Sequence, residues 1–194
     1  MKCLSFWLCA GWLLTGCASE EPLYKGKPTR YWVKQLRDRD EDTRWNAAKA
    51  LGDIGTGEGG SIEALVTALG DKEREVSRKA SEALASIGPK AVPALIQALK
   101  SENGDTRDCA ADALGGIGRE AQAAVPTLID LVKRKDSEAF LAAVYALGEI
   151  GAGARAAVPA LKEAQKDVDE NTSQAIASAL AKIEEAKSPP TKPE

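Results

Sequence analysis

The sequence repeats an apolar pair at a constant spacing. In five segments a large apolar residue is followed 22 positions later by an isoleucine, and the pairs are Trp32/Ile54, Leu65/Ile87, Leu95/Ile117, Leu128/Ile150 and Leu161/Ile183. Consecutive isoleucines are 33, 30, 33 and 33 residues apart. A period of this size is typical of proteins built from stacked supersecondary units. The short interval coincides with a connection, Gly88 to Val92, that is three residues shorter than Gly118 to Val125.

Each repeat is predicted to be a short helix, a turn and a longer second helix. In the second helices the positions seven, four, three and zero before the isoleucine are apolar, which is helical spacing. The first two of these positions are small, so neighbouring helices can approach closely. Glycines follow the first four isoleucines and are predicted to end the second helices in a left-handed conformation: Gly55, Gly88, Gly118 and Gly151. Prolines recur in the first turn of the first helices: Pro93, Pro126 and Pro159.

This pattern predicts an all-α fold, a right-handed α-solenoid of about five helical hairpins over residues 28–186. The repeats are expected at about 28–55, 56–88, 89–118, 119–151 and 152–186. A polar residue stands fourteen positions before each isoleucine, where it is interpreted as a capping or first-turn group of the second helix rather than a metal ligand: Asp40, Glu73, Asn103, Asp136 and Asp169.

The amino terminus has the features of a targeting segment. Residues 1–16 carry one positive charge, Lys2, and then an apolar stretch too short to span a bilayer. Leu14-Thr15-Gly16-Cys17 resembles the lipobox of bacterial lipoproteins, which implies cleavage before Cys17, its lipidation, and a location in the bacterial envelope, at the outer membrane or periplasm rather than the cell surface. The alternative is an ordinary secretory signal with an incidental cysteine. Residues 17–27 are predicted to be a tether, and residues 187–194 a disordered proline-rich tail.

The composition excludes several kinds of chemistry. The chain has no histidine, which removes the commonest general base and histidine metal sites, and its net charge of −3 disfavours nucleic acid as a partner. Once Cys3 and Cys9 leave with the signal and Cys17 carries lipid, Cys109 has no partner for an intramolecular disulfide. The acidic residues are spread along the repeats, and no group of them is expected to converge on one spot. We therefore expect no catalytic residues, no metal, no cofactor and no small-molecule substrate.

The second helices resemble a known family. Ala-x-Ala-Leu-Gly-x-Ile-Gly ends at Gly55 and again at Gly118, with arginine ten residues before the isoleucine at Arg44 and Arg107. This resembles HEAT repeats of the phycobilisome-lyase-like subclass, over about four fifths of the chain, and the stretch from Tyr24 to Pro28 leading to Trp32 looks like the opening of bacterial HEAT-repeat lipoproteins. Such repeats occur in scaffolds, chromophore lyases and metal-dependent hydroxylases, and the last class uses histidines that this chain lacks. Serine or phenylalanine replaces the arginine in the other repeats, at Ser77, Phe140 and Ser173.

The stacked second helices are predicted to form a binding strip on what is usually the inner, concave face of a solenoid. Positions nine and five before the isoleucines lie one helical turn apart. They read Trp45, Arg78, Asp108, Leu141, Gln174 and Lys49, Glu82, Asp112, Tyr145, Ser178, and the first four of each row are the candidate partner-binding residues. Trp45 and Tyr145 are expected to flank a charged centre. The alternative is that Trp45 packs on the amino-terminal cap and the charges are merely solvated.

These observations favour one function over two others. The leading hypothesis is a lipid-anchored, non-catalytic scaffold of the bacterial envelope that binds an unidentified protein through the second helices and the membrane through its lipid. One alternative, implied only by the family resemblance, is a bilin lyase-like enzyme or chaperone. The other is a structural spacer of the envelope with no binding role.

Overall fold

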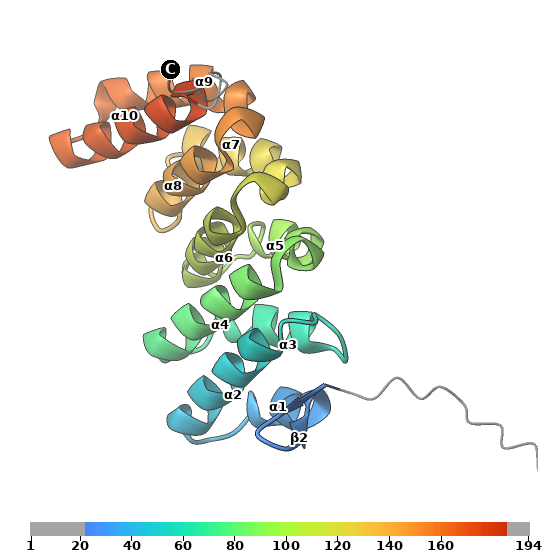
Figure 1. The fold of residues 1–194 in the computed structure, drawn as a ribbon. Helices are drawn as coiled ribbons and strands as arrows, with labels where there is room; N and C mark the ends of the chain where they lie inside the picture. Colours follow the sequence, from blue (N-terminus) through green and yellow to red (C-terminus); the bar gives the residue numbers. More distant parts are fainter. Residues whose placement is uncertain (1–21, 186–194) are drawn as a thin grey trace, which may run out of the picture.

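The computed structural model describes residues 22–185, which form a stack of helical hairpins (Figure 1). Ten α-helices lie in these residues: α1 Thr29–Gln35, α2 Glu41–Ile54, α3 Ser61–Ala68, α4 Arg74–Ile87, α5 Val92–Ala98, α6 Gly104–Ile117, α7 Val125–Lys133, α8 Phe140–Ile150, α9 Val158–Ala164 and α10 Glu170–Glu185. The predicted α-solenoid is confirmed. The predicted signal segment, Cys17 and the tail 187–194 lie outside the described residues.

The even-numbered helices stack in one row and the odd-numbered helices in another. Each second helix packs on the next along the row from α2 to α10, and α3 packs on α5 and α7 on α9 in the other row. The row of second helices bends so that its two ends lean toward the same side (Figure 1). The second helices therefore line the concave side of the solenoid, as predicted.

The core follows the repeat register. The residues seven and three positions before the first four isoleucines are almost completely buried: Ala47, Ala80, Ala110, Ala143 and Leu51, Leu84, Leu114, Leu147. The small residues allow close helix contact, since a Cβ built on Gly52 of α2 would lie 2.9 Å from the Cα of Ala83 in α4. Leucine and isoleucine side chains then fill the space between the two rows.

The glycines that end the second helices take two conformations. Gly55 is left-handed (φ 65°, ψ 4°). The left-handed prediction is wrong for Gly88, Gly118 and Gly151, whose φ is positive but whose ψ is −141°, −133° and −129°. A residue without Cβ adopts this region readily. It turns the chain straight into a 3₁₀ segment that leads to the next first helix: η1 Gly88–Ala91, η2 Gly118–Ala124 and η3 Gly151–Ala157. The prolines stand in the first turn of these first helices, as predicted.

The polar residues before the second helices cap them. The side chains of Asp40, Asn103 and Asp169 each accept a hydrogen bond from a backbone N–H three residues later, and Asp136 accepts one from Ala139. The capping interpretation is confirmed for these four positions. Glu73 stands at the N-cap of α4 but makes no such bond.

The predicted tether is partly folded. β1 (Leu23–Tyr24) and β2 (Lys27–Pro28) form an antiparallel hairpin whose turn residues, Lys25 and Gly26, both have positive φ. The Tyr24 ring packs edge-on against Trp32 of α1, with ring centroids 5.8 Å apart. The tether prediction is therefore wrong for residues 23–27, because the hairpin packs on α1 and α2.

One stretch of the described chain, Phe140–Asp167, is long and apolar enough by length and composition to cross a membrane. It is not one straight helix. It comprises α8, η3, α9 and the short 3₁₀ turn η4 (Gln165–Asp167), and 56% of its most apolar window is buried inside the fold. Its apolar character is accounted for by the core of the solenoid.

Candidate protein-binding face

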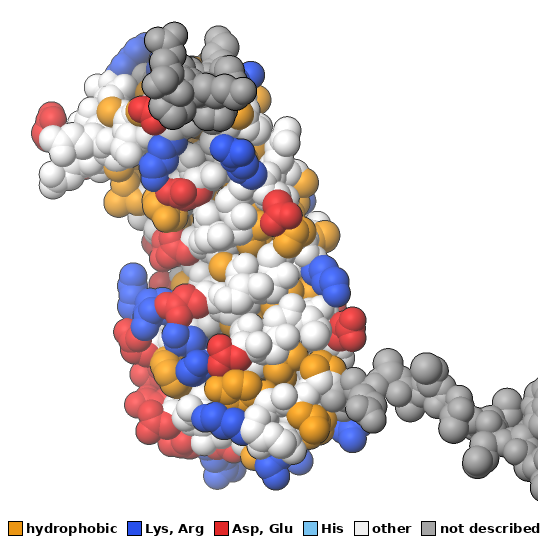
Figure 2. Space-filling view, in the orientation of Figure 1, with side chains coloured by type: hydrophobic (Ala, Val, Ile, Leu, Met, Phe, Trp, Pro, Cys, Tyr) orange, Lys and Arg blue, Asp and Glu red, His pale blue; other side chains and the backbone are white. Residues whose placement is uncertain are grey.

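The structure places the eight predicted binding residues along the concave side. Each of the helices α2, α4, α6 and α8 carries two of them, one helical turn apart: Trp45 and Lys49, Arg78 and Glu82, Asp108 and Asp112, Leu141 and Tyr145. We call these eight residues the strip. Figure 2 shows charged side chains of both signs over α2 and α4, and hydrophobic side chains over α8 along the same edge.

At the α2 and α4 end of the strip the charges are paired locally. Lys49 forms an ion pair with Asp53 at 2.8 Å, and Arg78 lies between Glu75, also at 2.8 Å, and Glu82. The hydrogen bond from Lys49 lowers the pKa of Asp53. On these two helices the charged side chains of the strip already have neighbours of opposite sign.

Trp45 is less available than predicted. Its side chain is half-buried, and the Lys79 ammonium lies 5.1 Å from its ring centroid, in cation–π range. Lys79 was not predicted to belong to this face. It follows Arg78 directly on α4, and its side chain reaches the Trp45 ring on α2. It also pairs with Glu82. Trp45 thus packs against α4 rather than standing free as an anchor.

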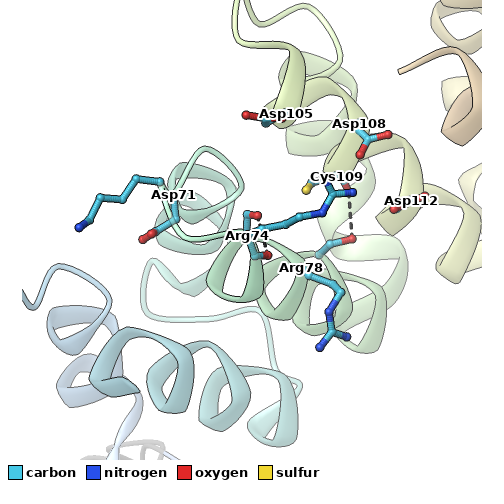
Figure 3. A pocket seen from close by; sticks show the side chains of 10 residues that line it. Asp71, Arg74, Arg78, Asp105, Asp108, Cys109 and Asp112 are labelled. Carbon is cyan, nitrogen blue, oxygen red and sulfur yellow. Dashed lines mark hydrogen bonds between the residues drawn. The ribbon is translucent and has the colours of Figure 1, made fainter. Parts of the chain in front are cut away.

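A hollow of about 200 Å³ lies between α4 and α6. Its floor includes the buried Ser77 and Ser81, and α6 contributes Cys109 and three carboxylates, Asp105, Asp108 and Asp112. Figure 3 shows Arg74 extending from α4 toward this side of α6. The prediction that no carboxylates converge is wrong here. The intervals of three and four residues between these aspartates are the sequence signal that points to one helix face.

The three aspartates of the hollow make no hydrogen bond or ion pair within residues 22–185. Desolvation by the surrounding helices, and then the neighbouring Asp108, raise the pKa of Asp112 to about 6 while Arg74 partly opposes the shift. Desolvation likewise raises the pKa of Asp108. Within the described chain no group of three or more histidine, cysteine, aspartate or glutamate side chains could hold a metal ion. The hollow therefore carries an excess of negative charge that Arg74, which also lines it, offsets only in part.

Cys109 lies in the same hollow and is partly buried. Burial first, and the three neighbouring aspartates in addition, raise the pKa of its thiol, although a hydrogen bond with Ser77 opposes this shift. A thiol with a raised pKa is a poor nucleophile at neutral pH because little of it is thiolate.

The α8 end of the strip is apolar and open. Leu141 and Tyr145 are 53% and 52% exposed, although both are large apolar side chains. They line a groove of about 300 Å³ between α8 and α10, with Val144, Gly148, Ala175, Ser178, Ala179 and Lys182. The Lys182 ammonium lies 5.5 Å from the Tyr145 ring centroid and pairs with Glu149. The strip thus has an apolar surface on α8 directly after the acidic hollow of α6.

The family of the chain follows from its repeats. The HEAT-repeat profile matches residues 29–107 and 92–181. The chain belongs to the HEAT-repeat family. Among curated proteins, none matches its sequence.

Solved structures support the same fold for this HEAT-repeat protein. A chain of the complex of CpcE and CpcF of phycocyanin lyase from Nostoc sp. PCC7120 is 26% identical with a TM-score of 0.61, over 86% of this chain and 69% of that chain. An engineered protein is 28% identical with a TM-score of 0.52, over 81% and 79%. A Kap121p mutant, 14% identical with a TM-score of 0.54 over 80% and 19%, supports the fold alone.

The two arginines of the HEAT motif are structural in this HEAT-repeat protein. Arg44 and Arg107 are mostly buried and pair with Asp71 and Asp136 of the following repeats at 2.7 and 3.0 Å. The sequence analysis singled out the arginines but not these partnerships. Ser77 stands at the equivalent position of the second repeat and lines the hollow instead, so the hollow lies at a repeat boundary that has no such arginine.

Proposed function

We propose that this HEAT-repeat protein is a non-catalytic scaffold that binds another protein through the concave strip. The observation that carries the proposal is the exposure of Leu141 and Tyr145 on the concave side, next to the unpaired aspartates of α6. Large apolar side chains grouped on a concave surface gain free energy when a partner removes them from water. A structural spacer has no need of such a surface.

The chemistry of the chain supports a non-catalytic role. It has no histidine, and the raised pKa of Cys109 disfavours a thiolate nucleophile. What the strip offers is charge and apolar area, which are means of recognition.

The binding role is tested by capture from cell extract with the full-length chain as bait. Leu141→Ser combined with Tyr145→Ser removes the apolar surface, and we expect loss of a protein that the wild type retains. Leu23→Ser is the matched control, because Leu23 is 66% exposed and lies on β1, which packs on α2 rather than on α8. Retention of the same proteins by all three baits would refute the proposed face.

We also propose that the protein is anchored in the bacterial envelope by lipid on Cys17, with the solenoid on the periplasmic side of the outer membrane. The support is the lipobox resemblance of Leu14-Thr15-Gly16-Cys17 after a short apolar segment. Labelling of cells with radioactive palmitate should mark the wild type but not Cys17→Ala, and the variant should leave the membrane fraction. Equal labelling of both would contradict the anchor.

A second candidate function rests on the likeness to the chain from the CpcE and CpcF complex of phycocyanin lyase. It is a role as a bilin lyase-like enzyme or chaperone. Titration of the full-length chain with a bilin distinguishes the two functions. A shifted and saturable visible absorbance would favour this candidate, whereas an unchanged bilin spectrum would leave the scaffold as the better account.

A further inference from the structure

The acidic and apolar parts of the strip are neighbours. Leu141 and Tyr145 lie 33 residues after Asp108 and Asp112, which places each pair at the same height on adjacent helices. The helices α6 and α8 are packed together, and a Cβ built on Gly115 of α6 would lie 3.0 Å from the Tyr145 ring. The Tyr145 ring therefore lies against α6, one turn from Asp112, and the two surfaces form one continuous area.

Asp108 and Asp112 of α6 differ from three acids of the helices before it. On α2 and α4, Asp53, Glu75 and Glu82 each have a lysine or arginine within ion-pair distance. Asp108 and Asp112 have none among residues 22–185, and Asp108 is partly buried while Asp112 is exposed. Arg74, on the α4 side, acts on both only through its longer-range charge. Asp108 and Asp112 lie one helical turn apart on the same face of α6, where their charges repel each other, and a cation supplied from outside would reduce that repulsion.

The distance between α6 and α8 sets how far apart two side chains of a ligand must be to contact both the acidic and the apolar surface. Packed helices lie about 10 Å apart, and an extended chain rises about 3.3 Å per residue. A chain crossing from α6 to α8 therefore covers the distance in about three residues. Asp105, Asp108 and Asp112 disfavour a polyanion on the α6 side of the hollow.

We propose that the strip binds an extended segment of a partner protein. A lysine or arginine of this segment lies between Asp108 and Asp112. A large apolar side chain, about three residues before or after it, occupies the groove of Leu141 and Tyr145. This inference rests on the proposed scaffold function and specifies the chemistry of the partner.

Synthetic peptides test the proposal with the full-length chain. Fluorescein-labelled glycine-serine peptides would carry one arginine and one leucine, separated by one, three or six positions, and their binding would be followed by fluorescence anisotropy. We expect the three-residue spacing to bind most tightly. Asp108→Asn with Asp112→Asn, and separately Leu141→Ser with Tyr145→Ser, should each weaken that peptide by about tenfold, a typical value for loss of one interfacial charge pair or apolar anchor.

A matched control and a charge exchange complete the design. Glu63→Gln with Glu163→Gln removes two charges from the first helices α3 and α9 and should leave binding unchanged. Asp108→Lys with Asp112→Lys should prefer a peptide with glutamate in place of arginine, provided that circular dichroism shows the wild-type helix content. If the lysine variant does not fold, the asparagine pair tests the charge instead, because it should abolish the preference for the arginine peptide over the glutamate peptide.

The proposal is overturned if the wild type binds the arginine and glutamate peptides equally, or binds neither. Its failure is distinguishable from failure of the scaffold function. If the Leu141/Tyr145 variant loses a captured protein but the wild type does not prefer the arginine peptide, the binding face is supported and the proposal of a basic segment is rejected. No effect in either experiment would reject both.

Discussion

Arg44 of the first repeat donates hydrogen bonds from Nε and Nη2 to both carboxylate oxygens of Asp71 in the second repeat, at 2.7 and 2.9 Å. Its Nη1 donates to the backbone carbonyls of Asp38 and Arg39. One buried guanidinium thus joins α2, the turn before it and the turn of the next repeat. Arg107 joins the third and fourth repeats in the same way through Asp136. The planar fork of arginine suits such two-oxygen contacts.

We predict that Arg44→Ala lowers the free energy of unfolding by roughly 3 kcal/mol, because it leaves the carboxylate of Asp71 without its cation in a mostly buried site. Urea denaturation followed by circular dichroism measures the change. Arg78→Ala is the control, since Arg78 forms an exposed ion pair and should cost less than about 1 kcal/mol. Equal effects of the two substitutions would show that the Arg44 bridge is not a special support of the repeat boundary.

Gly52→Ala is predicted to destabilise the protein by about 1 kcal/mol, although alanine is the better helix former. The added methyl would lie 2.9 Å from the Cα of Ala83, so α2 and α4 must separate. Thermal unfolding of Gly52→Ala should be compared with that of Asn46→Ala, which changes an exposed position of the same helix and creates no such contact. A raised melting temperature for Gly52→Ala would contradict the close packing.

Asp112 should make stability depend on pH. Its pKa of about 6 in the folded protein exceeds its ordinary value of 3.8, so the folded state binds more protons than the unfolded state between these values. Stability is therefore expected to fall as the pH rises through this window. Asp112→Asn should raise the melting temperature relative to wild type at pH 7, but not at pH 3, where the carboxyl is protonated in both states. Ser86→Ala, an exposed change on α4 that removes no titratable group, should show no such difference between the two pH values.

Cys109 is predicted to react slowly with iodoacetamide in the folded protein at neutral pH. Burial and the adjacent aspartates hold the pKa of its thiol above the ordinary value, so the thiolate is scarce. Alkylation of the Cys109 peptide, quantified by mass spectrometry, should accelerate strongly when urea unfolds the chain. A folded-state rate equal to the unfolded one would show that the hollow does not shield the thiol.

Most of the fold could be predicted because each repeat depends on local rules. The isoleucine register, the small residues of Ala47 and its equivalents, and the caps such as Asp40 act within one or two turns of helix, so their spacing is sufficient. The conformation of Gly88 could not be predicted in the same way. Its ψ depends on whether a 3₁₀ segment or a loop follows, and that choice depends on packing against the next repeat.

The candidate site was predictable in position but not in character. Register alone placed the eight residues of the strip on one concave row. It could not show that Lys79 covers Trp45, that Arg78 is already paired, or that Asp108 and Asp112 are not, because charge pairing depends on side-chain reach between helices.

The sequence by itself therefore determined the repeat, the helices and the side of the solenoid on which the strip lies, since these follow from periodicities of one chain segment. Only the tertiary structure decided how repeats meet: the Arg44 bridge to Asp71, the hairpin that brings Tyr24 onto Trp32, and the hollow that opens where Ser77 replaces arginine. These features join residues that are distant in sequence, and their geometry is set by how closely the helices pack.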